Sequence, residues 1–104
     1  MTKKNLTVYW SETSLKQSKI IKVYLSGAFS KTEVIHFLSL LKKFESTISS
    51  FPEIYPKSKI KRDLHRAVLN KYLSVYYQLK KNKLYVVAVL DNRQNQESKI
   101  QRLK

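Results

Sequence analysis

The chain opens with a short alternating stretch and then changes to helical spacing. In residues 6–10 every second residue is apolar, which predicts a first strand. From Ser11, a suitable N-cap, to Ala28, apolar residues recur every three or four positions, which predicts a helix. The buried stripe expected of this helix consists of Ile20, Ile21, Tyr24, Leu25 and Ala28.

A second helix is predicted directly after the first. Ser30 and Glu33 form a capping box, and helical spacing continues from there to about Ser49. Pro52 and Pro56 exclude a continued helix beyond it, so two antiparallel helices joined by a short turn are expected. The buried stripe expected here consists of Val34, Phe37, Leu38, Leu41, Phe44 and Ile48.

The second half of the chain has the period of strands. Residues 60–69 alternate loosely, and residues 72–79 alternate strictly, with Tyr77 on the apolar face. Residues 80–83 are a polar turn, and residues 84–90 are apolar throughout, as expected of a central strand. The predicted order is β-α-α-β-β-β.

This order predicts an α+β fold, with the helical hairpin packed on a small, mainly antiparallel four-stranded twisted sheet. The length of 104 residues suits one domain over residues 1–104, in which residues 97–104 form a flexible tail or a short helix.

Positive charge is the strongest signal in the composition. The formal net charge is +14, and residues 57–104 alone contain thirteen basic and three acidic residues, a net +10. Such a field attracts polyanions, namely nucleic acid, anionic lipid or an acidic protein partner. The alternative is that the lysines only keep the protein soluble.

Several kinds of chemistry find no support in the residues. The chain has no cysteine, and neither His36 nor His65 has a second ligand at metal-binding spacing, so no metal and no cofactor are expected. The single glycine leaves no phosphate-binding loop. Because no apolar run reaches the ~20 residues of a membrane span, and no signal peptide is evident, a cytoplasmic protein without membrane contact is expected.

Residues 57–66 contain the densest basic cluster. If they form a strand, Lys59, Lys61 and His65 share one face, and Arg62 and Arg66 the other. The functional interpretation is a phosphate-binding strip. The alternative is a solvated edge strand, in which lysines prevent aggregation, or an arginine paired with a carboxylate such as Asp63, Asp91 or Glu97.

Tyrosine is the second unusual feature, with seven residues. Tyr77 is expected in the core. Tyr72 and Tyr76 are placed on the more polar face of their strand, where aromatic rings beside cations can stack on bases. A third candidate is Arg93, which the last strand delivers to solvent in a cluster of polar residues.

Several of these features together resemble one family of proteins. They are the element order, the opening Val8-Tyr9-Trp10-Ser11, the linker between Pro52 and Pro56, the strand over residues 71–77 and the ending over residues 89–95. Over about residues 5–99 the chain resembles the RelE/ParE superfamily, toxins of bacterial toxin–antitoxin modules that include plasmid-stabilization systems.

This resemblance implies a small basic toxin of a type II module, neutralised by an acidic antitoxin encoded next to it. In the RelE branch it implies a metal-independent endoribonuclease, an mRNA interferase that cleaves messenger RNA on the ribosome. In the ParE branch it implies an inhibitor of DNA gyrase. Both expectations are kept, together with a third: a non-catalytic basic module that only binds RNA or a protein.

The family's functional positions match this chain in part. Arg93 corresponds to an arginine after the last strand, Arg66 lies near a basic position on the second strand, and His65 is the nearest imidazole. These three are the expected catalytic residues. However, Leu73 occupies a place where the RNA-cleaving branch usually has arginine, and no Tyr or His follows Arg93 in residues 94–99. The expected nucleic-acid or target contacts are Lys59, Lys61, Arg62, Tyr72 and Tyr76.

Overall fold

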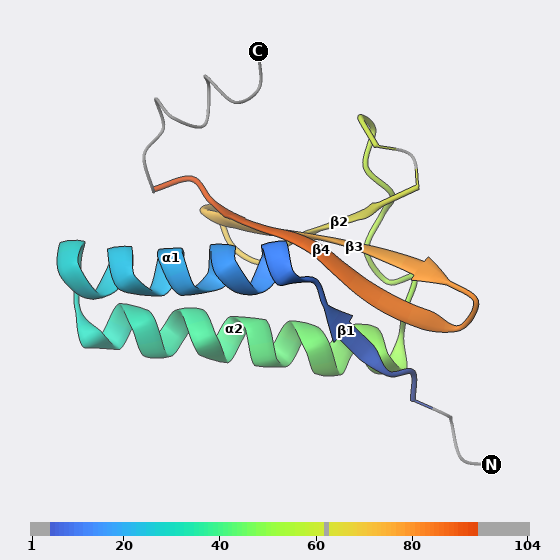
Figure 1. Ribbon diagram of the computed structural model, residues 1–104, viewed down its shortest axis with the longest axis horizontal. Helices are drawn as coiled ribbons and strands as arrows, with labels where there is room; N and C mark the ends of the chain where they lie inside the picture. The colour runs from blue at the N-terminus through green and yellow to red at the C-terminus, as the bar shows by residue number, and fades with distance from the viewer. Residues whose placement is uncertain (1–4, 62, 94–104) are drawn as a thin grey trace.

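A computed structural model describes residues 5–61 and 63–93, so the predicted tail over residues 97–104 lies outside the described residues. The elements follow the predicted order, and the α+β class is confirmed (Figure 1). Their bounds are β1 Val8–Trp10, α1 Glu12–Ala28, α2 Lys31–Ser50, β2 His65–Val68, β3 Leu73–Lys80 and β4 Lys83–Asp91.

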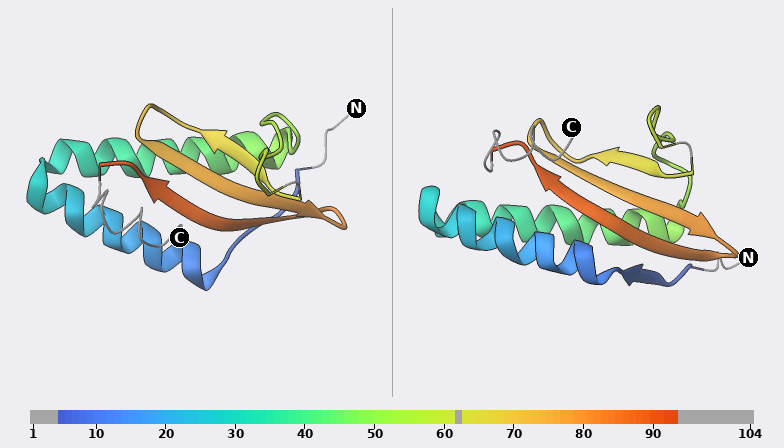
Figure 2. Two further views of the ribbon diagram at one scale, coloured as in Figure 1. Left: turned by 90° about the horizontal axis from the view of Figure 1, so that it is seen from above. Right: turned by 45° about the horizontal axis from the view of Figure 1, so that its top comes forward.

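Both helices begin at the serines that the sequence indicates. The Ser11 side chain accepts a hydrogen bond from the Ser14 backbone N–H at 3.0 Å, and Ser30 accepts one from the Glu33 N–H at 3.3 Å. Each bond satisfies a donor that the helix itself leaves unpaired. The helices run antiparallel beneath one face of the sheet and leave its other face open (Figures 1 and 2).

The four strands form one mixed sheet in the order β1-β4-β3-β2. β1 pairs with β4 in parallel, and the β4–β3 and β3–β2 pairs are antiparallel, as a mainly antiparallel sheet requires. β4 is therefore a central strand, which explains why its sequence is apolar on both faces. β1 and β2 form the two edges.

A β-bulge interrupts the pairing between β3 and β4. Tyr76 pairs with Ala88, and Tyr77 pairs with Val86, so Val87 has no partner on β3. Two side chains from the N-terminal half of α1 and its cap bond to backbone groups of β4 near the bulge. Ser11 Oγ donates to the Val87 carbonyl at 3.2 Å, and Gln17 Oε1 accepts from the Val89 N–H at 2.8 Å. The bulge changes which residues of β4 face the helices.

The core lies between the helices and the covered face of the sheet. Its centre is aromatic, because the Phe44 ring contacts Trp10, Tyr55 and Tyr77 at centroid distances of 5.6–6.3 Å. The predicted stripes are correct for most positions, but Ile20, Ala28 and Leu38 are exposed, because they lie on the margins of the helix faces that meet the sheet. The buried apolar residues are Ile21, Leu25, Phe37, Leu41, Phe44, Ile48, Ala67, Leu73, Val75, Tyr77, Leu84, Val86 and Val89.

The expected strand over residues 60–69 is wrong at its beginning. Residues 57–61, 63 and 64 lie in a turn stabilised by Ser58, whose hydroxyl accepts from the N–H groups of Ile60 and Lys61 at 3.2 Å. The Ser58 N–H donates to the Leu64 carbonyl at 2.7 Å, which closes the turn. β2 can therefore begin only at His65.

In the described part of the chain, neither helix is long and apolar enough to cross a membrane.

We expect Phe44→Ala to lower the free energy of unfolding by about 3–5 kcal/mol, because it removes the ring that three other aromatic side chains contact. Ile60→Ala is the matched control. Its side chain is 87% exposed, so the change should stay within about 0.5 kcal/mol. Urea denaturation measures both values, and equal stability of the two variants would contradict the described core.

Candidate functional site

A groove lies on the open face of the sheet, between β2 and the turn over residues 57–64. The turn folds back along β2, since Lys57 forms an isolated bridge with His65 and the Arg66 N–H donates to the Pro56 carbonyl at 2.9 Å. We call it the basic groove. Its lining residues are Pro56, Lys57, Ser58, Lys59, Ile60, Arg66, Val68 and Tyr76.

The basic groove brings together three residues that the sequence predicts as site residues. The register of β2 and β3 places Arg66 directly opposite Tyr76, and Lys59 reaches the same groove from the turn. Lys57 is a fourth member; it belongs to the basic cluster over residues 57–66, but it was not among the predicted contact residues. Among the described residues no carboxylate pairs with these cations. Cations beside an aromatic ring are suited to bind phosphates and a base or another flat group.

His65 is not part of this groove. The expectation that it shares a face with Lys59 and Lys61 is wrong, because both lysines lie in the turn and His65 begins the strand. Its ring faces the helices, is 5% exposed and stacks on Tyr77 at a centroid distance of 4.9 Å. His65 Nδ1 lies 2.7 Å from the Tyr55 carbonyl. This burial gives it a role in the core.

The remaining residues of the basic cluster lie elsewhere. Lys61 is exposed on the turn and does not line the groove. The predicted contact Arg62 lies outside the described residues.

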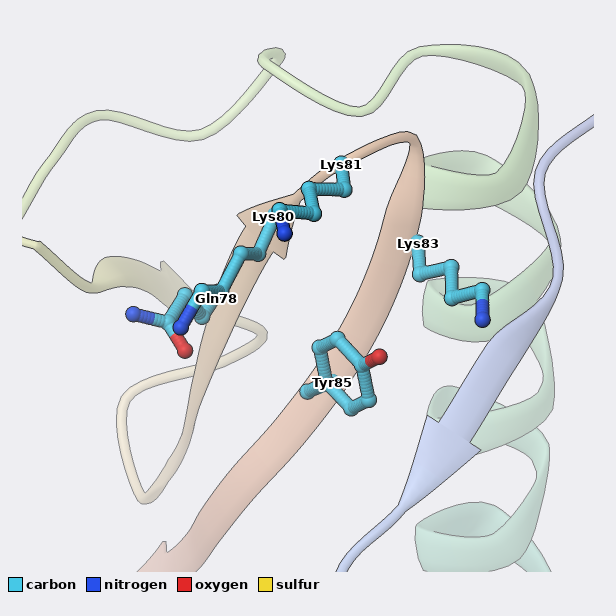
Figure 3. Close-up of a pocket in the computed structure, with 5 residues that line it drawn as sticks. All are labelled: Gln78, Lys80, Lys81, Lys83 and Tyr85. Atoms are coloured by element: carbon cyan, nitrogen blue, oxygen red, sulfur yellow. The ribbon is translucent and has the colours of Figure 1, made fainter.

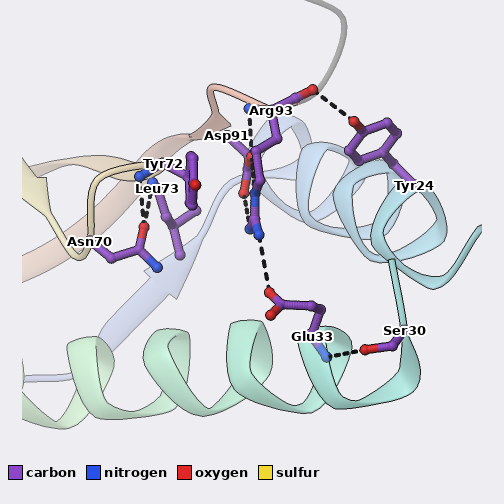
Figure 4. A network of polar contacts seen from close by, with 8 residues as sticks. All are labelled: Tyr24, Ser30, Glu33, Asn70, Tyr72, Leu73, Asp91 and Arg93. Atoms are coloured by element: carbon purple, nitrogen blue, oxygen red, sulfur yellow. Dashed lines mark hydrogen bonds and ion pairs between the residues drawn. The ribbon is translucent and has the colours of Figure 1, made fainter. Parts of the chain in front are cut away.

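Arg93 lies just after β4 in a cluster of ion pairs (Figure 4). Its NH2 group is 2.8 Å from Asp91 Oδ2, its Nε donates to Asp91 Oδ1 at 3.1 Å, and its NH1 group is 3.0 Å from Glu33 Oε2. The hydrogen bonds that Arg93 donates to the Asp91 carboxylate, followed by the one to Glu33, raise the pKa of the guanidinium further above its usual range, although burial opposes this. The guanidinium is held as a permanent cation.

Aromatic rings enclose the same guanidinium. Its central carbon lies 4.5 Å from the Tyr72 ring centroid and 5.3 Å from that of Phe29, and the side chain is 13% exposed. The Tyr24 hydroxyl donates to the Arg93 carbonyl at 2.8 Å (Figure 4). The expectation that β4 delivers Arg93 to solvent is therefore wrong. Arg93 instead connects the end of β4 to both helices, through Tyr24 of α1 and Glu33 of α2.

Glu33 explains part of this difference. The sequence indicates a capping box, in which the Glu33 carboxylate turns back to the backbone of Ser30. Only half of the box forms, because the carboxylate pairs with Arg93, 60 residues further along the chain. Charge composition marks Glu33 and Arg93 as possible partners, but no local pattern connects them.

The three expected catalytic residues are not brought together. Asp91, two residues before Arg93, pairs with Leu73 of β3, and His65 pairs with Tyr77 of the same strand. Leu73 and Tyr77 are four residues apart, which is about 13 Å along β3 at the usual rise per residue. Arg66 faces the opposite side of the sheet from His65. The cluster around Arg93 borders its own hollow, which includes the exposed His36 of α2. Within the described residues no three His, Asp or Glu side chains could hold a metal ion together.

We expect Arg93→Ala to lower the free energy of unfolding by about 3–5 kcal/mol, because the Asp91 carboxylate, with 0% of its side chain exposed, would lose its cation. Arg66→Ala, which removes an exposed arginine, should change it by less than about 0.5 kcal/mol. In an Asp91→Asn background Arg93→Ala should cost clearly less. Chemical denaturation of the wild type, the two single variants at positions 91 and 93 and their double variant measures this coupling. An Arg93→Ala variant as stable as the wild type would contradict the prediction.

Burial raises the pKa of the Tyr77 hydroxyl from its ordinary value of 10 to about 12. The unfolded chain loses this proton at lower pH than the folded one. The contribution to stability is therefore complete below pH 10 and is lost as the pH rises to about 12. We expect Tyr77→Phe to lose less stability over this range than the wild type, measured by denaturation at a series of pH values. Tyr9→Phe, at an exposed ring, should behave as the wild type.

No protein-family model matches the sequence, and no curated protein sequence matches it. Solved structures match the fold. A chain of the chromosomal ParDE TA system from P. aeruginosa superimposes with a TM-score of 0.71 at 6% identity, covering 83% of this chain and 95% of that one. A chain of the E. coli DinJ–YafQ toxin–antitoxin complex gives 0.56 at 11% identity, covering 86% and 94%. The conserved hypothetical protein HP0894 from Helicobacter pylori gives 0.55 at 15% identity, covering 85% and 96%. The chain therefore has a fold that is also found in chains of toxin–antitoxin systems, and the likeness to these structures is one of fold.

Proposed function

We propose that this chain is the toxin of a type II toxin–antitoxin module, that it arrests bacterial growth, and that a cognate acidic antitoxin neutralises it. Two chains of the same fold come from such systems. The observation that carries the proposal for this chain is the basic groove, in which Arg66, Lys57 and Lys59 surround Tyr76 on an otherwise open sheet face. A small fold that displays unneutralised cations attracts polyanionic partners.

Within this proposal we favour a toxin that inhibits its target by binding to it over a toxin that cleaves RNA. Inhibition of DNA gyrase is the model for the first, and ribosome-dependent mRNA cleavage is the alternative. Cleavage needs a free cation to stabilise charge on the phosphate and a group that moves protons. Of the three expected catalytic residues, Arg93 is paired with two carboxylates and His65 is buried, so only Arg66 is exposed. Both targets are cytoplasmic, so the protein would act there.

The alternative of mRNA cleavage has one observation in its favour. Arg66 and Tyr76 stand side by side in the basic groove, and a cation beside a phenol could act on a phosphate without metal. In this case the site would centre on the basic groove, and Arg93 would only stabilise the fold.

The proposed antitoxin would cover the positive field of residues 57–104. It would be a small acidic protein, encoded in the neighbouring gene, and its affinity would fall as salt screens the charges. Co-purification from the native operon at low salt tests this partner directly.

We expect expression of the chain in bacteria to stop growth. Expression of the Arg66→Ala/Tyr76→Ala double variant should leave at least tenfold more surviving colonies than expression of the wild type. The double change removes Arg66 and the aromatic ring of the basic groove and leaves the core intact. Lys42→Ala/Lys43→Ala, on the exposed face of α2, is the control for lost charge. Because Arg93→Ala is expected to damage the fold, it is unsuitable for this test.

The same cells separate the mechanisms. DNA damage with intact messages, and loss of gyrase supercoiling in vitro, would support a toxin that holds its target. Cleaved messages on ribosomes, lost in the Arg66→Ala/Tyr76→Ala variant, would support the nuclease alternative. If the wild type does not slow growth at all, the toxin proposal is refuted and a non-catalytic binding module takes its place.

A further inference from the structure

Three lysines gather at the tip of the β3–β4 hairpin, away from the basic groove. Lys80 ends β3, Lys81 lies in the turn and Lys83 begins β4. Together with Gln78 and Tyr85 they line a shallow hollow (Figure 3). We call these five residues the lysine hairpin. The sequence analysis treated this segment only as a polar turn.

The lysine hairpin concentrates charge at a cost to the sheet. Lys80 and Lys83 are directly opposite each other in the register, and like charges in this position destabilise a strand pair. None of the three lysines forms an ion pair with a carboxylate in the described part of the chain. The nearby Asp63 carboxylate accepts a hydrogen bond from Gln78 instead. The positive charge is therefore left for an external partner.

The turn itself carries a second unfavourable choice. Lys81 and Asn82 have φ angles of 49° and 62°, as the two-residue turn of a hairpin requires. Gly adopts this left-handed conformation freely and Asn tolerates it, but at Lys81 the Cβ atom comes close to the backbone carbonyl, which is sterically unfavourable. A lysine is thus kept where glycine would be more stable. Local strain of this kind is typical of positions that serve binding.

An aromatic surface adjoins the lysines. Tyr85 of β4 stacks on Tyr9 of β1 with ring centroids 5.5 Å apart and an interplanar angle of 23°. Lys83 Nζ lies 6.0 Å from the Tyr9 ring centroid, and Tyr9 is 44% exposed. Cations that follow a phosphate backbone, beside a ring on which a base can stack, are the combination used to bind single-stranded nucleic acid.

We propose that the lysine hairpin is a binding site for single-stranded nucleic acid, in which Lys80, Lys81 and Lys83 contact backbone phosphates and a base stacks on the exposed Tyr9 ring. The site goes beyond the proposed toxin function and does not depend on it. Its contacts are to phosphates and a base face, which RNA and DNA share.

The test is fluorescence anisotropy with the purified full chain and a labelled 12-nucleotide single strand of mixed sequence, as RNA and as DNA. Lys80→Gln/Lys83→Gln should weaken binding of both and reduce the slope of log K against log salt by about 1.4, since each phosphate contact on a single strand contributes about 0.7. Lys42→Gln/Lys43→Gln on α2 removes the same net charge and should leave the slope unchanged. Equal weakening by the two pairs would overturn the proposal, because net charge alone would then explain binding.

Lys81→Gly separates binding from folding. It should raise Tm by about 4 °C, because glycine relieves the strained turn, and at the same time weaken binding of the single strand. A more stable variant that binds as tightly as the wild type would overturn the role of Lys81. A wild type that arrests growth but does not bind the single strands would refute this inference alone, whereas a wild type that binds them without arresting growth would refute only the toxin function.

Discussion

The β-bulge opposite Tyr76 and Tyr77 is the constraint on which most of this structure depends. In a regular strand, the residues of β4 that face the helices would continue from Leu84 and Val86 to Ala88 and Leu90. The extra residue at Val87 reverses the alternation, so that Val89 and Asp91 face inward and are buried. Ser11 and Gln17 satisfy the neighbouring backbone groups, which ties the bulge to the start of α1.

A buried carboxylate at the end of a central strand must be neutralised, and this requirement determines the role of Arg93. Asp91 is 2% exposed, and Arg93 supplies both the cation and two side-chain hydrogen bonds to it. Glu33 and the Tyr72 and Phe29 rings then hold the guanidinium in place. Arg93 therefore stabilises the junction of sheet and helices, and the proposed functions rest on other cations, which no carboxylate of the described residues engages.

Those cations lie around the open face of the sheet. Arg66 and Tyr76 lie on one side in the basic groove, and Tyr85 and Tyr9 continue the row of rings toward the lysine hairpin on the other. Because the helices cover only the opposite face, these side chains can meet a large partner without rearrangement of the core (Figure 2). The proposed antitoxin and the proposed single-stranded ligand would compete for the same positive field.

The order of the elements, both helix N-termini and the central position of β4 could all be predicted from the amino-acid sequence, because periodicity, caps and a continuous apolar run are local properties. The sequence also identified Lys59, Arg66 and Tyr76, which the fold brings into one groove. Three other features could be recognised only in the folded protein. They are the start of β2 at His65, the burial of His65 against Tyr77, and the pairing of Arg93 with Glu33 across 60 residues. Each of these features depends on the turn closed by Ser58 or on the β-bulge at Val87. Successive residues of a strand face opposite sides of the sheet, so a shift of one residue moves a side chain from one face to the other.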